Sequence, residues 1–358
     1  MGMKHRIDQL QLVRLLAAML VLVGHARDKV AAGTDTLAGA ANFYAGGVDV
    51  FFVLSGFIMF VISRDDAGRP LGWLDFLRKR LTRVVPPYWL FTTLMLVAMA
   101  AVPGLVSNAA LDPVHVLASY VFVPVHNPQG EAFPVLALGW TLNHEMFFYV
   151  LFAVGLLLPW PRGAWLTAGL VAFCGLIGAL TPPQQLPASF WLNPIVFEFL
   201  LGMALGAAHQ AGWRVRPGVG AALSLLGVVG LWFGASEFGG GVLVPERALW
   251  MGAPALLVVA GGALMQAKAS GGLLMRAGVL GGDASYALYL SHPFTLAVCA
   301  AAFRSLGWPF GMGTLLLASG VCLGVAIAFH LWLEKPMVNR LNRMLSRPRI
   351  DTPCASST

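Results

Sequence analysis

The sequence predicts an all-α membrane protein that crosses the bilayer many times. Of its 358 residues, 58% are hydrophobic and only 11% are charged, and the mean hydropathy is +0.75. A soluble domain carries about 25% charged residues, roughly twice that share. The net charge of +7 comes from Lys and Arg in short loops between apolar segments, a distribution that argues against a nucleic-acid-binding role.

Apolar segments of about 17 to 25 residues are long enough to cross a bilayer as helices. The ten expected spans are 8–26, 46–63, 84–103, 138–158, 164–181, 191–210, 218–234, 247–267, 284–304 and 312–333. Residues 115–125 are apolar but short, so we expect an interfacial or re-entrant piece in an outer loop. We assign residues 1–340 to one transmembrane domain and expect 341–358 to form a short basic and polar cytoplasmic tail without fixed structure.

The distribution of basic residues sets the expected orientation, since cytoplasmic loops carry an excess of Lys and Arg. With the N-terminus inside, the inner segments hold 18 of the 23 Lys and Arg residues and the outer segments hold four. The remaining one, Arg14, lies inside a span. This asymmetry predicts that both termini are cytoplasmic.

The first expected span contains two costly side chains, Arg14 and His25. They are eleven residues apart, which in an α-helix places them on nearly the same face and roughly 16 Å apart along the axis. Polar residues inside a bilayer usually face a cavity or a partner. The alternative is that the two side chains extend to opposite membrane interfaces.

Polar residues near the outer ends of two further spans are candidates for the same site. Asp49 begins the second span, where an N-cap is the alternative role. The same span holds small residues that we expect to let neighbouring helices approach closely: Gly46, Gly47, Ser55 and Gly56. Asn143 and Glu145 enter the fourth span at a depth similar to that of His25. Glu145 is therefore a candidate to orient the imidazole and raise its basicity, with a structural contact between helices as the alternative.

The inner loop before the third span holds four basic residues within six positions, including Arg80 and Arg83. Arginine suits a phosphorylated cytoplasmic ligand, because its guanidinium group makes paired hydrogen bonds to phosphate. Positive-inside topology with binding to lipid headgroups is the alternative.

The ninth expected span carries Ser285, Tyr289 and His292 on one helix face, spaced i, i+4, i+7. For His292 the alternative is a core histidine. In the sixth span Glu198 is a lone carboxylate, and we expect it to pair with Arg14 or another interior group. The sequence contains no convincing metal site, P-loop or dinucleotide fingerprint.

Taken in order, these motifs resemble the membrane acyltransferases of family 3, ten-span bacterial enzymes that include exopolysaccharide and lipopolysaccharide O-acetyltransferases. The shared features are Arg14 and His25 with ten residues between them, GGVDVFFVLSGFI, RLTRVVPPYW with Arg80 and Arg83, GWTLNHEMFFY, FEFLLGM and SYALYLSHP. Each motif alone is weak, but the ordered set is specific and covers nearly the whole chain. GWTLNHEMFFY most resembles the subgroup that acts on exopolysaccharides.

The resemblance implies transfer of an acyl group, in most cases acetyl, from cytoplasmic acyl-CoA to a saccharide hydroxyl outside the bacterial inner membrane. Acetyl-CoA is then a co-substrate, and no cofactor or metal is bound permanently. The saccharide acceptor can be lipid-linked, membrane lipids are further partners, and the sequence does not indicate an oligomeric state.

In this scheme His25 is the general base, with Glu145 and Arg14 as the other catalytic candidates. The residues expected to bind acyl-CoA are Arg14, Arg80 and Arg83. Those expected on the acceptor or oxyanion side are Asp49, Asn143, Tyr289 and His292. Three alternatives remain. The first is a secondary transporter with a His and Glu proton relay, and the second is a non-enzymatic partner or assembly protein of a polysaccharide export system. The third is an acyltransferase that modifies a lipid or a small-molecule glycoside.

Overall fold

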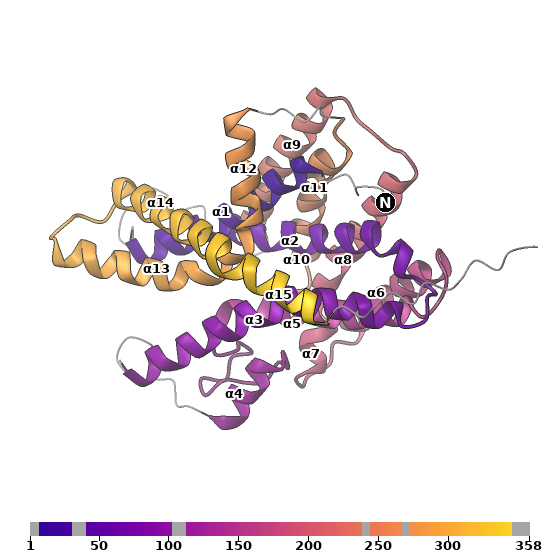
Figure 1. Ribbon diagram of the computed structural model, residues 1–358, viewed down its shortest axis with the longest axis horizontal. Helices are drawn as coiled ribbons and strands as arrows, with labels where there is room; N and C mark the ends of the chain where they lie inside the picture. The colour runs from indigo at the N-terminus through magenta and orange to yellow at the C-terminus, as the bar shows by residue number, and fades with distance from the viewer. Residues whose placement is uncertain (1–6, 31–40, 102–111, 238–243, 267–271, 346–358) are drawn as a thin grey trace, which may run out of the picture.

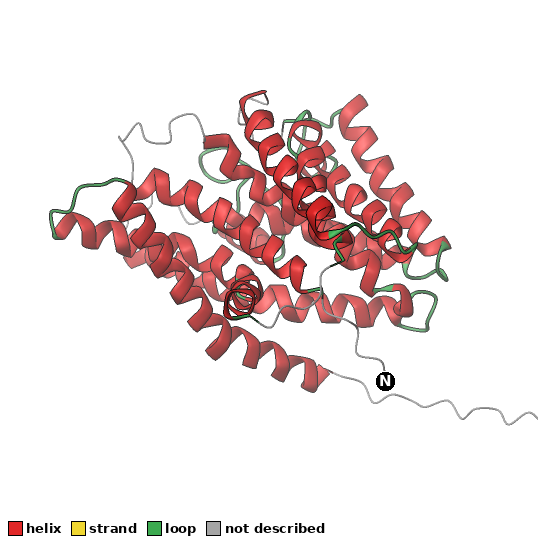
Figure 2. Ribbon diagram, turned by 90° about the horizontal axis from the view of Figure 1, so that it is seen from above, coloured by secondary structure: helices red, strands yellow, loops and turns green. Residues whose placement is uncertain are grey.

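Helices make up nearly all of the structure (Figure 2), a computed structural model that describes residues 7–30, 41–101, 112–237, 244–266 and 272–345. No β-strand occurs in these ranges apart from an isolated bridge between Val215 and Met265. The long helices are α1 (Asp8–Val30), α2 (Ala41–Ile62), α3 (Gly72–Ala101), α6 (Arg162–Leu180), α9 (Pro217–Glu237), α13 (Ser285–Ser305) and α14 (Met312–Phe329). The shorter ones are α4 (Pro113–Tyr120), α5 (Trp140–Gly155), α7 (Ala188–Trp191), α8 (Phe197–Gln210), α10 (Arg247–Trp250), α11 (Gly252–Leu264), α12 (Leu273–Asp283) and α15 (Lys335–Leu345). Helices α10 and α11 follow each other directly and together form an apolar segment of 18 residues, Arg247–Leu264.

The expected all-α, multi-span fold class is confirmed. In the described ranges, eight helices are long and apolar enough to cross a membrane. The other two expected spans, 138–158 and 191–210, contain α5 with 16 residues and α8 with 14. At about 1.5 Å per residue these helices measure roughly 24 and 21 Å, less than the hydrocarbon thickness of about 30 Å. The count of ten spans and the orientation of the termini stay predictions.

The boundaries of several expected elements differ from those of the structure. Helix α3 begins at Gly72, well before the expected start at 84, so its first turns carry the basic cluster. Helix α12 was not expected. A π-helical turn, His330–Glu334, joins α14 directly to α15, so residues 341–345 of the expected tail are helical. Residues 346–358 lie outside the described ranges.

Helix α4 occupies the start of the expected interfacial segment 115–125. Asp112 caps it, because its carboxylate accepts hydrogen bonds from the backbone N–H groups of Val114 and His115. The end of α4 is fastened to α3, since Tyr88 donates to the Ser119 carbonyl over 3.1 Å. This segment therefore packs on the helix bundle as a short helix.

Helix α2 runs through the middle of the structure and packs along α8 (Figure 1). Small residues allow this approach: a Cβ on Gly56 would lie 2.0 Å from the Phe199 carbonyl oxygen, and one on Gly202 would lie 2.0 Å from that of Val53. A Cβ on Gly47 would likewise meet the Ala17 carbonyl of α1 at 2.3 Å. The expectation that glycines of span two serve close helix packing is confirmed.

Helices α1 and α13 lie side by side, and α13 and α14 extend together from the rest of the bundle (Figure 1). A buried apolar cluster joins the three helices and includes Leu22, Leu288 and Cys322. A larger cluster joins α2, α3, α5, α6 and α8 and contains many aromatic side chains. Side chains of α1, α2, α3, α5 and α13 line a cavity between these helices.

Candidate active site

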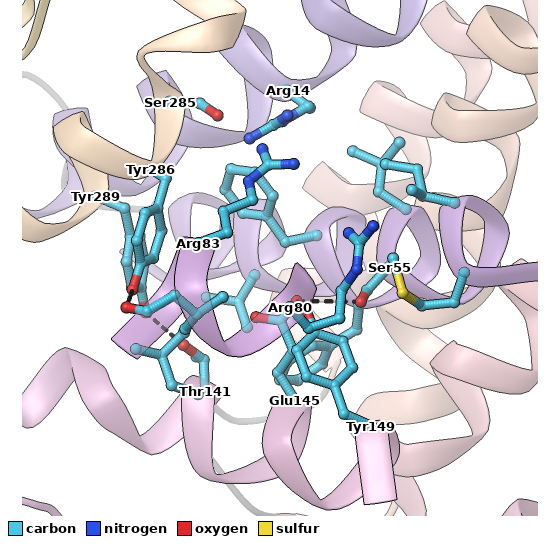
Figure 3. A pocket seen from close by; sticks show the side chains of 18 residues that line it. Arg14, Ser55, Arg80, Arg83, Thr141, Glu145, Tyr149, Ser285, Tyr286 and Tyr289 are labelled. Carbon is cyan, nitrogen blue, oxygen red and sulfur yellow. Dashed lines mark hydrogen bonds between the residues drawn. The ribbon is translucent and has the colours of Figure 1, made fainter. Parts of the chain in front are cut away.

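The cavity contains about 860 Å³ of space free of protein atoms, part of it open to solvent, and is lined by side chains from five helices (Figure 3). Its polar lining consists of Arg14, Ser55, Arg80, Arg83, Thr141, Glu145, Tyr149, Ser285, Tyr286 and Tyr289. Its apolar lining comes mainly from α2, with Val48, Phe51, Phe52, Leu54, Ile58 and Met59, together with Val84 and Leu142. A long ligand with an anionic end and an apolar body fits such a lining.

Three arginines give the cavity its charge. Arg14 comes from α1, and Arg80 and Arg83 come from adjacent turns of α3. In Figure 3 the guanidinium groups of Arg14 and Arg83 lie close together and that of Arg80 lies nearer Ser55. The buried Nε of Arg80 has no hydrogen-bond partner among the described residues. The structure thus brings together the three residues expected to bind an anionic ligand.

Glu145 is the acidic residue of the cavity lining. Its Oε1 accepts hydrogen bonds from the Ser55 hydroxyl at 3.1 Å and from the Tyr149 hydroxyl at 2.5 Å. Both donors are neutral, so they fix the carboxylate without cancelling its charge. Beside three guanidinium groups, one carboxylate leaves the lining with an excess of positive charge.

His25 has a different partner from the one expected. Its Nδ1 lies 2.9 Å from Nε2 of His292, and the two rings lie edge to edge with centroids 5.0 Å apart. His25 is exposed, whereas His292 is 1% exposed. The predicted contact between Glu145 and His25 is therefore wrong: similar depth on two helices placed both residues near the site but not against each other.

Tyr289 links the cavity to the histidine pair. Its hydroxyl donates to the Leu138 carbonyl at 3.0 Å and lies 2.9 Å from the Thr141 hydroxyl at the cavity wall. Its ring centroid is 6.3 Å from that of His292. The expected shared face of Ser285, Tyr289 and His292 is confirmed, with the first two residues lining the cavity and the third beyond it.

Helices α1 and α13 carry this arrangement in parallel. Arg14 and Ser285 both line the cavity, and further along each chain His25 meets His292. The rise from Arg14 to His25 is roughly 16 Å and that from Ser285 to His292 roughly 10 Å. The cavity and the histidine pair therefore lie one after the other along α1 and α13.

Asp49 does not lie on the acceptor side of the site, so that expectation is corrected. Its carboxylate forms a two-point ion pair with Arg247, with Nε to Oδ1 at 2.9 Å and Nη2 to Oδ2 at 2.7 Å. The side chains are 0% and 2% exposed. Glu198, expected to pair with Arg14, lies beside these two residues instead. Buried charges are stable only when paired, which explains why these residues from distant segments meet.

Asn143 is also displaced from its expected role. It is 1% exposed, it does not line the cavity, and its Oδ1 has no partner among the described residues. The neighbouring His144 is equally buried and lies 3.0 Å from the Phe190 carbonyl, a contact between helices.

Sequence reasoning missed several polar residues of the site. Thr141 and Tyr286 gave no signal as isolated hydroxyl residues in apolar spans, and Ser55 was interpreted only as a small packing residue. Arg247 was assigned to an outer loop because it begins an apolar run. A signal existed for Tyr149, which follows Glu145 by one helical turn.

In the described part of the chain, no group of three or more His, Cys, Asp or Glu residues could hold a metal ion. Fold and site together define a multi-span membrane protein with an arginine-lined interior cavity beside a paired histidine, an arrangement suited to an enzyme with an anionic substrate.

Comparison with known proteins identifies the family. A model of the acyltransferase domain of family 3 matches residues 7–333, and the chain belongs to this family. It is an O-acyltransferase.

Two relatives are similar over most of their length. The exopolysaccharide production protein ExoZ of Rhizobium meliloti (strain 1021) is 38% identical over 308 residues, which cover 83% of this chain and 90% of ExoZ. The acyltransferase MdmB of Streptomyces mycarofaciens is 28% identical over 346 residues, which cover 84% of this chain and 82% of MdmB. No solved structure gives a significant match.

Proposed function

We propose that this protein transfers an acyl group, most simply acetyl, from cytoplasmic acyl-CoA to a hydroxyl of an extracytoplasmic saccharide. The proposal rests on one observation: the exposed His25 is hydrogen-bonded to His292 on the helix pair that also lines the arginine-rich cavity. The similarity to a protein named for exopolysaccharide production supports a saccharide acceptor. The basic inner loops support an inner-membrane orientation with the donor on the cytoplasmic side.

On the donor side, the phosphates of CoA bind at Arg80 and Arg83, because guanidinium groups form charge-assisted hydrogen bonds with phosphate oxygens. The pantetheine arm passes Arg14 and lies against the apolar wall of α2. Glu145, held by Ser55 and Tyr149, orders the arginine side chains and offers an acceptor to the amide N–H groups of the arm. The thioester then lies near Tyr289, at the end of the cavity that faces the histidine pair.

On the acceptor side, His25 removes the proton of the saccharide hydroxyl as its oxygen attacks the thioester carbonyl carbon. The new C–O bond forms, and the C–S bond breaks when the tetrahedral intermediate collapses. The thiolate of CoA takes the proton from the imidazolium, so the products are the saccharide ester and free CoA. The hydroxyls of Tyr289 and Thr141 hydrogen-bond the Leu138 carbonyl, and one of them stabilises the developing oxyanion when it turns its proton from that carbonyl toward the substrate.

Transport of label into glycan tests the whole scheme. Inside-out membrane vesicles from cells that express the protein receive acetyl-CoA labelled in the acetyl group, and label in the saccharide of the vesicle lumen is counted. We expect transfer in inside-out vesicles and none in right-side-out vesicles, because CoA does not cross the membrane. Label found only in lipid would reject the saccharide acceptor, and solute exchange without use of acetyl-CoA would support the transporter instead.

His25→Ala tests the general base, and His126→Ala is the matched control because His126 is also exposed but lies outside the site. General-base catalysis contributes typically 10²- to 10⁴-fold, so we expect about this loss for His25→Ala and none for the control. Full transfer by correctly inserted His25→Ala protein would refute the assignment.

A further inference from the structure

We infer that His292 is a positioning residue: it fixes the tautomer of His25 so that Nε2 of His25 is the free, basic nitrogen. This inference rests on the proposed function of His25. It concerns a residue that does not line the cavity and is too deeply buried to meet the acceptor, with 1% exposure. The argument starts from the hydrogen bond that His292 makes with its own helix.

Nδ1 of His292 lies 3.0 Å from the carbonyl oxygen of Leu288 on the preceding turn of α13. A carbonyl oxygen only accepts hydrogen bonds, so Nδ1 must carry the proton. A neutral imidazole has a single N–H, and Nε2 of His292 is therefore an acceptor. The backbone of α13 thus decides the tautomer of His292.

Nδ1 of His25 lies 2.9 Å from this acceptor, so it must be the donor. The one proton of the neutral His25 ring then lies on Nδ1, which leaves Nε2 with a free lone pair. The two ring planes differ by only 23°, so this hydrogen bond lies close to the plane of both rings and orients the ring of His25. Two hydrogen bonds in series, from His292 to the Leu288 carbonyl and from His25 to His292, therefore leave Nε2 of His25 unprotonated.

The reverse direction requires His292 to carry protons on both nitrogens. It would then be a buried cation, and in the described residues no carboxylate is hydrogen-bonded to it. A buried charge without such a partner is strongly unfavourable. The neutral arrangement is the one that leaves no charge unpaired.

This arrangement prepares the proton transfer. When Nε2 of His25 takes the proton of the acceptor hydroxyl, the Nδ1–H bond to His292 remains and no atom has to move. Without His292 the only acceptor left beside the His25 ring among the described residues is the Val21 carbonyl, one turn back on α1. The form of His25 with its proton on Nε2, which cannot act as a base at that nitrogen, then becomes more populated. Part of the general-base contribution of about 10²- to 10⁴-fold is then lost.

The amide side chains of Gln and Asn give a matched pair of variants. The terminal amide of Gln in His292→Gln reaches the position of Nε2 and supplies an oxygen that accepts from His25. The shorter side chain in His292→Asn reaches only the position of Nδ1, where it can still donate to the Leu288 carbonyl. We expect His292→Gln to keep kcat within about tenfold of the wild type and His292→Asn to lose about 10²-fold, with the KM for acetyl-CoA unchanged in both.

The tautomer itself is read by ¹⁵N NMR of protein labelled at histidine in lipid bilayers, with His25→Ala to assign the His25 signals. We expect one protonated Nδ1 and one unprotonated Nε2 for His25 in the wild type and in His292→Gln. In His292→Asn we expect signals from both tautomers. A role of His292 in packing alone would lower the yield of folded protein but would not change these signals.

The outcomes separate the two proposals. Wild-type kcat and an unchanged His25 tautomer in His292→Asn would overturn the positioning role. Equal losses of kcat in His292→Gln and His292→Asn, with the wild-type tautomer in both, would also overturn it. If His25→Ala kept full activity, the proposed function of His25 would fail, while the NMR experiment would still report whether His292 sets the tautomer.

Discussion

The buried ion pair of Asp49 and Arg247 leads to a prediction that separates stability from catalysis. Arg247→Met keeps an apolar side chain of similar length but leaves the carboxylate of Asp49 without its partner. The pair consists of two charge-assisted hydrogen bonds at 2.7 and 2.9 Å between side chains that are at most 2% exposed. Arg247 also donates to the Ala45 carbonyl at 3.1 Å and lies 5.9 Å from the ring centroid of Trp140.

The magnitude follows from these contacts. Removal of one partner of a buried pair costs about 3–5 kcal/mol, because the other charge stays in a region that water does not reach. Since about 1.4 kcal/mol corresponds to a factor of ten, the ratio of folded to unfolded protein should fall by about 10²- to 4 × 10³-fold. The exposed Arg304 gives the control, and Arg304→Met should cost less than about 1 kcal/mol.

The assay is equilibrium unfolding of the purified protein in mixed micelles, followed by tryptophan fluorescence. Asp49→Asn should be destabilised as Arg247→Met is, and the double variant should lose less than the sum of the single losses, because the carboxylate of Asp49 and the guanidinium group of Arg247 are removed together. Transfer activity per folded molecule should stay close to that of the wild type, since neither side chain lines the cavity. Additive losses, or a selective loss of activity in Asp49→Asn, would refute this reasoning.

Two further predictions follow from the cavity and the helix packing. Arg83→Ala should raise the KM for acetyl-CoA at least about tenfold with a smaller effect on kcat, because a charge-assisted hydrogen bond contributes about 1.5–3 kcal/mol. Arg83→Lys should recover part of the lost affinity. An unchanged KM of Arg83→Ala in steady-state kinetics would contradict the prediction. Gly202→Val should abolish folding, since a Cβ there would lie 2.0 Å from the Val53 carbonyl oxygen. Gly218→Val is the control, because a Cβ there would meet nothing within 4 Å. Equal yields of monodisperse protein from the two variants on size exclusion would contradict the prediction.

Local composition and helix periodicity predicted much of the fold. Length and apolarity place eight of the expected spans, because a bilayer requires about 20 apolar residues whatever their order. The two short helices α5 and α8 could not be distinguished from full spans, because the apolar runs include the short 3₁₀ helices Ala137–Gly139 and Pro194–Val196 that directly precede them. The glycines of span two predicted that α2 packs closely against neighbouring helices, which are α1 and α8 in the structure.

For the site, the expectation succeeded where residues share one helix face. Arg80 and Arg83, and likewise Ser285 and Tyr289, lie one turn apart, so their common orientation follows from 3.6 residues per turn. It failed for contacts between helices, where depth is predictable but rotation and neighbours are not. Asp49, Glu145 and His25 lie at similar expected depth, and yet each has a different partner.

The sequence by itself determined the class of protein, the family and the presence of an arginine and a histidine on one face of the first span. Only the tertiary structure decided that His25 meets His292 rather than Glu145, and that Asp49 belongs to a buried ion pair. The physical reason is that helix formation depends on neighbours along the chain, whereas pairing of polar groups depends on which helix faces meet. Residues 25 and 292 are 267 positions apart, and only the packing of α1 along α13 brings them to 2.9 Å.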